Sequence, residues 1–396
     1  MNQEMMLSYD DVLLIPRRSD FNSRSETDIS VEFCGQKYDM PIIMSPMTCV
    51  TSPEMIKFFI DNKMIPTVHR FFKSAEEQYT YVYLGLYEQI LLEENGIKFD
   101  DWEERRKLRE NTLTFDNKRL MKKLKDEINE VYFAVGSVNK WKDWIDYLLK
   151  LGIKKFCVDM AHGHSKPCID TIKCLRKQGK DIKIIAGNIA TSSARKDLEK
   201  VGVNSLRCPI GSGICCTTSI NTGFGVSTVS SLMDLDGIKN KKSQIIADGG
   251  IRNTGDMVKA IYFGADVVML GRLLAATDLA AGSSYNSNMM LIAKDKVIYD
   301  EQNRNVFYKE YFGMSSEKAR KGVLSKGSIE GVSGMIKYTG TTRDLIDNIK
   351  LNMKSALSYG GCKTWNELRE KVEHKIISNA SILERKTHLD VTKGGM

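Results

Sequence analysis

Short apolar runs that alternate with amphipathic segments constrain the fold of this chain more than any other feature. From about residue 154 the runs end in Gly, Asp or Asn, and stretches of helical periodicity follow them. Strands that are apolar along their whole length are typical of parallel sheets buried on both faces. The expected strands are 154–160, 181–189, 204–213, 243–250 and 265–272, and the expected helices include 167–180 and 192–202.

Three more strands are expected upstream, within 37–47, 62–70 and 130–138, with a helix over 53–62. Eight strand–helix units close into a (β/α)8 barrel, the TIM barrel of the α/β class, and a doubly wound open sheet is the alternative. We expect the whole chain, 1–396, to form one catalytic barrel domain, which a pair of helices within 343–372 closes.

Two segments interrupt the alternation. Residues 73–129 are charged, helix-prone and poor in glycine, which indicates a solvated helical insertion after the second strand, with a recognition surface as the alternative. Residues 273–345 follow the eighth strand and are expected to hold a hairpin within 289–313, a mobile flap and an active-site loop. Long segments on this side of a barrel are where lids occur.

Composition excludes several classes of protein. No stretch of about 20 apolar residues is present, so we expect no membrane-spanning helix. The opening residues lack a secretory pattern and the nine cysteines lack a repeated spacing, so we expect a cytoplasmic protein with reduced thiols. The net charge of +8 comes from scattered lysines, which favours an anionic small molecule as partner over a nucleic acid. With five histidines and no Cys-x-x-Cys, a zinc site is not expected.

The segment 208–225, CPIGSGICCTTSINTGFG, carries the strongest candidate chemistry. Cys215 and Cys216 follow Gly211 and Gly213 in a loop at the end of a strand, and two threonines come next. A cysteine beside hydroxyl groups in such a loop suits a covalent nucleophile. A turn of small residues around buried thiols is the alternative.

Three glycine-rich loops could bind an anion. ADGGIRN (247–253) and LGRLL (270–274) follow the last two barrel strands, where phosphate groups often bind in this fold, and FGMSSE (312–317) offers amides and hydroxyls. In that arrangement Asp248 better suits a ribose hydroxyl. Packing of glycine-rich turns is the alternative. Together with a carboxylate such as Glu330, these residues indicate covalent chemistry on a nucleotide ring, without choosing the base or the reaction.

Motifs over nearly the whole chain resemble those of the IMP dehydrogenase and GMP reductase family, whose members share a (β/α)8 barrel. The opening LSYDDVLLIPRRS (7–19) resembles the family's first segment, and only about 73–129 lies outside the resemblance. Eight further motifs follow in the family's order: SPM (45–47), VDMAHGHS (158–165), AGNIAT (186–191), GSGICCTT (211–218), ADGG (247–250), VVMLG (267–271), FGMSS (312–316) and EGVSG (330–334).

The resemblance implies roles for individual residues. Cys216 would attack C2 of a purine nucleotide, while Thr218 and Glu330 move protons at the leaving group. The residues implied to bind substrate are Ser45, Met47, Asp248, Gly249, Gly250, Gly271, Arg272, Gly313, Met314, Ser315 and Gly331. Those implied to bind the dinucleotide are Ser23, Arg24, Arg70, Asp159, Met160, Ala161, Ile210, Gly211 and Met314. A monovalent cation, K⁺, is implied at Gly211, Gly213, Cys216 and Ser219.

The flap sequence bears on which reaction is implied. Dehydrogenases of the family hydrolyse the covalent intermediate with an Arg-Tyr pair on the flap, whereas the span from Ser316 to Glu330 contains Arg320 and no tyrosine. The resemblance therefore favours a GMP reductase, which uses NADPH to convert GMP to IMP and ammonia. Ser23 and Arg24 resemble the reductase pair that reaches the dinucleotide of a neighbouring subunit, which implies an oligomer, commonly a homotetramer.

Two other hypotheses stay open. An IMP dehydrogenase without the regulatory CBS modules would also fit, because 73–129 is too short for that pair. A barrel that binds purine nucleotides without turnover is the third hypothesis. Arg272, where the family usually has a small residue, and the Thr48-Cys49 pair after SPM motivate it.

Overall fold

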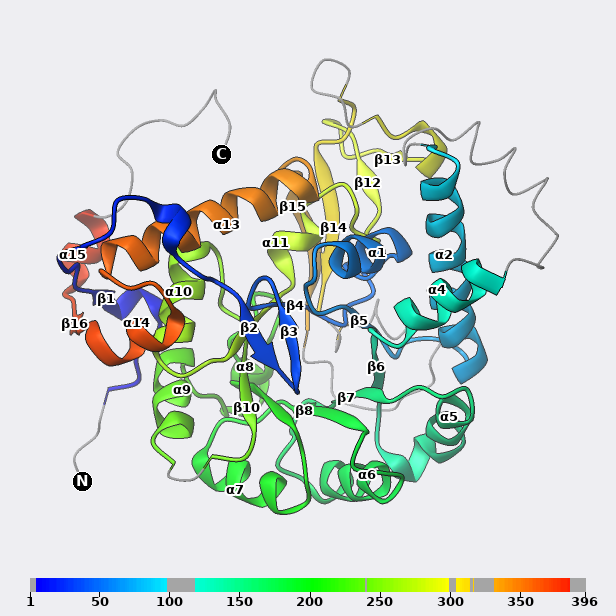
Figure 1. The fold of residues 1–396 in the computed structure, drawn as a ribbon, viewed down its shortest axis with the longest axis horizontal. Helices are drawn as coiled ribbons and strands as arrows, with labels where there is room; N and C mark the ends of the chain where they lie inside the picture. Colours follow the sequence, from blue (N-terminus) through cyan, green and yellow to red (C-terminus); the bar gives the residue numbers. More distant parts are fainter. Residues whose placement is uncertain are drawn as a thin grey trace.

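Eight parallel strands form the central sheet of the computed structural model, which describes residues 5–97, 118–238, 241–298, 304–313, 316 and 331–384. The hydrogen-bonded order is β4–β11–β10–β9–β8–β7–β6–β5 (Figure 1). The strands are β4 (Ile42–Met44), β5 (Thr67–Val68), β6 (Tyr132–Val135), β7 (Lys155–Asp159), β8 (Lys183–Gly187), β9 (Ser205–Cys208), β10 (Gln244–Asp248) and β11 (Val267–Leu270).

The sheet closes on itself between β4 and the residues just before β5. The Met44 amide donates to the Ile65 carbonyl at 3.0 Å, and the Ile65 amide donates to the Ile42 carbonyl at 3.1 Å. The prediction of a (β/α)8 barrel is therefore confirmed, and the open-sheet alternative is wrong. Each predicted strand contains one of the observed ones, with shorter bounds.

Helices surround the barrel and bury an apolar face against the strands. Several begin at polar caps, as when the Ser52, Thr191 and Asn253 side chains accept the amides of Met55, Ala194 and Asp256. The helices after the strands are α1 (Pro53–Asp61), α2 (Ala75–Glu94), α5 (Val138–Lys150), α6 (Lys166–Lys177), α7 (Ser192–Lys200), α8 (Thr218–Thr222), α9 (Thr228–Asp236), α10 (Thr254–Tyr262) and α11 (Arg272–Ala275). Of the helices in the described ranges, none is both long and apolar enough to cross a membrane.

A hairpin covers the amino-terminal end of the barrel. It comprises β2 (Val31–Phe33) and β3 (Gln36–Tyr38). Phe33 and Tyr38 are buried in one cluster with side chains of the barrel interior, and the Phe33 ring lies 6.4 Å from that of Tyr132 at the start of β6. The opposite, carboxyl-terminal end is left for loops and a binding site.

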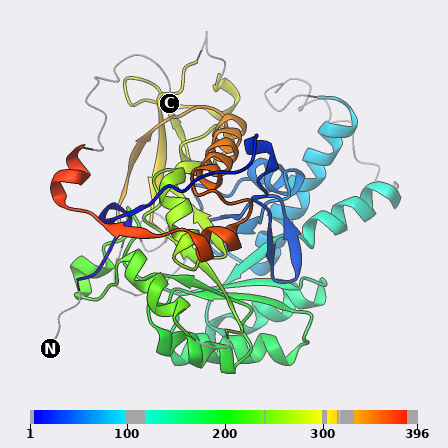
Figure 2. The same ribbon diagram turned by 60° about the vertical axis from the view of Figure 1, so that its left-hand side comes forward.

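The two ends of the described chain pair with each other. Strand β1 (Val12–Leu14) runs antiparallel to β16 (His374–Ile376), and Figure 2 shows the blue and red segments side by side. The expected helix pair within 343–372 corresponds to α13 (Thr342–Tyr359) and α14 (Trp365–Lys371). The remaining short elements are α15 (Asn379–Glu384) and the 3-10 turns η1 (Tyr9–Asp11), η2 (Arg24–Glu26) and η3 (Lys294–Lys296).

The described part of the 73–129 insertion is helical, as expected, but one face of it is buried rather than solvated. Helices α2 and α4 (Lys118–Ile128) pack against each other and α2 packs against α1, with Leu86 and Leu124 almost completely buried. The buried Lys57 of α1 lies with its Nζ 3.2 Å from Glu93 of α2 and 3.4 Å from Glu127 of α4. This ionic cluster ties both insertion helices to the barrel.

The segment after β11 forms a small antiparallel sheet of order β13–β12–β14–β15. A hairpin was expected within 289–313; the Asn305 amide donates to the Ile298 carbonyl at 3.3 Å, but β13 and β14 are not paired with each other. Strand β14 pairs with β12 and β15 instead of β13. The bounds are β12 (Ser284–Tyr285), β13 (Leu291–Ile292), β14 (Tyr308–Phe312) and β15 (Ser333–Lys337). The predicted flap, 317–330, lies outside the described residues.

Candidate active site

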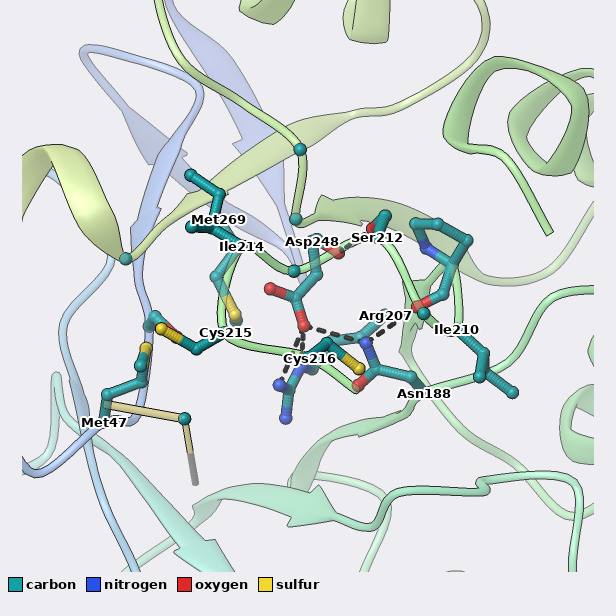
Figure 3. Close-up of a pocket in the computed structure, with 18 of the residues that line it drawn as sticks. Met47, Asn188, Arg207, Ile210, Ser212, Ile214, Cys215, Cys216, Asp248 and Met269 are labelled. Carbon is teal, nitrogen blue, oxygen red and sulfur yellow. Dashed lines mark hydrogen bonds and ion pairs between the residues drawn. The ribbon is translucent and has the colours of Figure 1, made fainter. Parts of the chain in front are cut away.

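A pocket of about 210 Å³ lies at the carboxyl-terminal end of the barrel strands (Figure 3). Its walls come from the ends of β4, β7, β9, β10 and β11 and from the loops that follow them. The predicted site residues that line it are Ser45, Met47, Arg70, Asp159, Met160, Ala161, Ile210, Gly211, Gly213, Cys216, Thr218, Asp248, Gly249, Gly250, Gly271, Arg272 and Gly313.

Some predicted site residues lie elsewhere. Ser23 and Arg24 are at η2, where the Arg24 guanidinium donates to the Ser355 hydroxyl of α13, so any contact with a neighbouring subunit stays a prediction. Ser219 lines an adjacent cavity, and Gly331 pairs with Cys216 in an isolated antiparallel bridge. Met314, Ser315 and Glu330 lie outside the described residues.

The loop after β9 gives its two cysteines different surroundings. Cys216 is partly exposed, and its Sγ lies 3.1 Å from the Thr218 hydroxyl, to which the thiol donates. Cys215 is only 9% exposed, and burial raises the pKa of its thiol, which disfavours the thiolate. The Cys215 carbonyl accepts the Val332 amide at 3.0 Å, which fixes this loop against the segment before β15. Cys216 is therefore the better placed nucleophile of the pair.

Close packing restricts the room for side chains at two of the pocket glycines. A Cβ at Gly249, where φ is +109°, would lie 2.5 Å from the Ser212 hydroxyl. A Cβ at Gly271 would lie 3.1 Å from Met47 Sδ and 3.3 Å from the Tyr311 hydroxyl. Contacts within the protein itself therefore favour glycine at these positions.

A buried ionic network forms the floor of the pocket. The Arg207 guanidinium, from the middle of β9, donates to Asp159 at 2.6 Å and to Asp248 at 2.8 Å. Asn188 adds a bond to Asp248 at 2.9 Å (Figure 3). Arg70 adds one to Asp159 at 3.1 Å. Burial by itself would raise the pKa of Asp159, but the two guanidinium groups hold it below the ordinary value. Both carboxylates are thus held in place at the carboxyl ends of β7 and β10, and the charged form of Asp159 is favoured.

Comparison with known proteins agrees with this geometry. Residues 6–388 match the family model described as IMP dehydrogenase / GMP reductase domain. The chain belongs to this family. It is 29% identical over 380 residues to a GMP reductase of Staphylococcus carnosus (strain TM300), an alignment that covers 95% of this chain and 97% of the relative. It is 30% identical over 383 residues to a GMP reductase of Staphylococcus aureus (strain JH9), with coverage of 95% and 97%.

Sequence reasoning assigned no site role to several pocket residues of this family member, among them Arg207, Asn188 and Tyr311. Arg207 is the one charged residue of β9, and a charged residue inside a barrel strand is a signal for a buried partner. Asn188 follows β8 inside the AGNIAT motif, where its amide had no assigned role. Tyr311, from β14, is buried at the wall beside Met47, and burial raises the pKa of its hydroxyl. Tyr311 lies on a strand of the small antiparallel sheet and not on a loop that follows a barrel strand, so no local sequence pattern pointed to it.

Proposed function

We propose that this chain is a GMP reductase, which converts GMP to IMP and ammonia with NADPH through a covalent bond between Cys216 and the purine. The observation that carries the proposal is the accessible Cys216 thiol, hydrogen-bonded to Thr218 in a pocket whose other wall is made of close-packed glycine loops. Two similar proteins named GMP reductase support this choice within the family.

The substrate would lie across the pocket with its phosphate at the glycine loops. The amides near Gly249, Gly250 and Gly271 are proposed to bind phosphate oxygens, with the Arg272 guanidinium adding positive charge. The Oδ2 of Asp248 accepts hydrogen bonds from Arg207 and Asn188. Its other carboxylate oxygen, Oδ1, is therefore the proposed acceptor for a ribose hydroxyl. Ser45, Met47, Gly313, Met314, Ser315 and Gly331 complete the proposed substrate contacts.

Covalent chemistry would begin at Cys216. Its thiolate adds to C2 of GMP, and a proton supplied through Thr218 and Glu330 lets the C2 amino group leave as ammonia. The purine is then bonded to sulfur at C2. NADPH, when bound, supplies a hydride to C2. The C–S bond then breaks, the electron pair returns to Cys216, and IMP is released. GMP, NADPH and two protons thus give IMP, NADP⁺ and an ammonium ion.

The dinucleotide would use the other side of the pocket. Arg70, Met160, Ala161 and Ile210 line the pocket near β5, β7 and β9, and the fixed Asp159 carboxylate lies among them. We propose Ser23 and Arg24 of a neighbouring subunit as further contacts within a homotetramer. The carbonyls of Gly211, Gly213 and Cys216, with Ser219, are the proposed K⁺ ligands, and Gly213 keeps one acceptor site after accepting the Cys216 amide.

Absorbance at 340 nm tests the reaction directly. A fall with GMP and NADPH, together with ammonia release, is the expected result. A rise with IMP and NAD⁺ in the presence of K⁺ would instead establish a dehydrogenase. No change in either mixture, with GMP binding intact, would establish a barrel that binds the nucleotide without turnover.

A further inference from the structure

A second cavity, of about 460 Å³, lies apart from the pocket described above. It is enclosed by the start of α1, by α2, and by the sheet strands β12, β13 and β14, which neighbour one another in Figure 1. Much of its wall is apolar, with contributions from Pro53, the Tyr81 ring, Leu279, Leu291 and Ile292. The shape and lining are those of a small-molecule site.

Lys309 of β14 provides a buried positive charge in this cavity. The residue is 1% exposed, and its Nζ donates to the Ala280 carbonyl at 3.0 Å and to the Ser284 hydroxyl at 3.3 Å. An ammonium group has three N–H donors, so one donor remains. No carboxylate of the described residues lies within ion-pair distance of this Nζ. Buried lysines are normally paired, because an uncompensated charge in the protein interior is costly.

The carboxylates nearest to Lys309 bind other groups. Asp278 accepts the backbone amides of Leu279 and Thr342 and the Thr342 hydroxyl, and so caps the start of α13. Glu54 of α1 forms an ion pair with Lys294 at 3.7 Å. Burial lowers the pKa of Lys309 to about 8, as expected for an ammonium group without a close counter-ion.

We propose that this cavity binds a small aliphatic carboxylate, whose oxygens accept the remaining Lys309 donor and whose hydrocarbon chain lies against the apolar wall. A monoanion is favoured over a phosphate dianion because Lys294 and Lys309 share the lining with Glu54, Glu88 and Asp278, and these carboxylates already balance most of the positive charge. The ligand supplies the counter-ion that the buried ammonium lacks. This site is independent of the proposed reaction, although β14 also supplies Tyr311 to the catalytic pocket.

Calorimetric titration of the full chain with hexanoate tests the proposal, with 1-hexanol and hexylamine as neutral and cationic counterparts of the same length. Hexanoate is expected to bind in a 1:1 complex, roughly tenfold or more tighter than hexanol, which is the usual gain from one charge-assisted hydrogen bond. Equal binding of hexanol would overturn the proposal, as would preferential binding of hexylamine or no detectable hexanoate binding in the millimolar range.

Two variants locate the site. Lys309→Met should weaken hexanoate binding by roughly tenfold or more, whereas Lys337→Met, an equal loss of charge on the exposed face of β15, should not. If Lys309→Met does not fold, Leu291→Trp tests the location of the site instead. Leu291 is 65% exposed at the cavity wall, so the larger indole ring should obstruct the cavity without disturbing the core. Unchanged hexanoate binding in Leu291→Trp would place the ligand elsewhere and overturn the proposal.

Discussion

The thiol of Cys216 and the hydroxyl of Thr218 lie 3.1 Å apart in the active-site pocket, while the adjacent Cys215 points its thiol into buried surroundings. The two neighbouring cysteines thus differ in their surroundings. Cys216 is accessible and has a hydroxyl partner, whereas Cys215 is buried and the pKa of its thiol is raised. This separation allows the two positions to serve as test and control for each other.

Replacing Cys216 by Ala should lower turnover of GMP by roughly a thousandfold or more, because no other group at this position can form the bond to C2. Binding of GMP should change only a few-fold, since the glycine loops are untouched. Steady-state rates and calorimetric titration measure the two effects. Cys215→Ala is the matched control. If it lost as much turnover as Cys216→Ala, the assignment of Cys216 as the nucleophile would be wrong.

The Gly249→Ala variant should weaken GMP binding by roughly tenfold or more, because the added Cβ would displace Ser212 and the proposed phosphate amides. Gly340→Ala provides the control for backbone strain. Gly340 has nearly the same φ, +110°, but no heavy atom lies within 4 Å of the point that an alanine Cβ would occupy there. Both variants should lose stability in a denaturant titration, and only the first should change the dissociation constant for GMP. Equal GMP affinity in the two variants would refute the assigned phosphate position.

Removing the Arg207 guanidinium should destabilise the fold strongly. Arg207→Met would leave the buried Asp159 and the partly buried Asp248 without their shared counter-ion, at a cost of about 3–5 kcal/mol in the free energy of unfolding. Urea denaturation measures this cost. Adding Asp159→Asn to the same chain should recover part of the loss, because it removes one of the two carboxylate charges that Arg207 binds. If the double variant is as unstable as the sum of the two single variants, the side chains are not coupled.

His69 should make the protein less stable in mild acid. Burial lowers the pKa of its ring from 6.5 to about 3 in the folded chain, where it stacks on Phe72 at 4.3 Å. Since the unfolded chain takes up the proton first, the stabilisation is complete above pH 6.5 and is lost as pH falls from 6.5 towards 3, by about 1.4 kcal/mol per pH unit. The His69→Gln variant should show a shallower fall in unfolding free energy between these limits. Identical slopes in both proteins would contradict the buried neutral ring.

The barrel could be predicted because each of its strands is a local apolar run, and the alternation with helices implies parallel pairing. The pairing of β14 could not, since β13, β12 and β15 offer similar short segments and only tertiary packing selects among them. Arg207 shows a second limit. Its partners Asp159 and Asp248 lie 48 and 41 residues away, and nothing local in the sequence identifies them. The candidate catalytic loop was easier to find because Cys216 and Thr218 are two residues apart.

The anchoring of α2 and α4 through Lys57 has a consequence for the evolution of this barrel. Each helix contacts the rest of the protein through its own side chains. Lengthening a connection between two such helices costs little conformational entropy, about 0.6 kcal/mol for each doubling. The chain connection between β5 and β6 is therefore a point at which a barrel of this kind can gain or lose whole modules over evolutionary time. The end of the barrel that holds the candidate active site need not change.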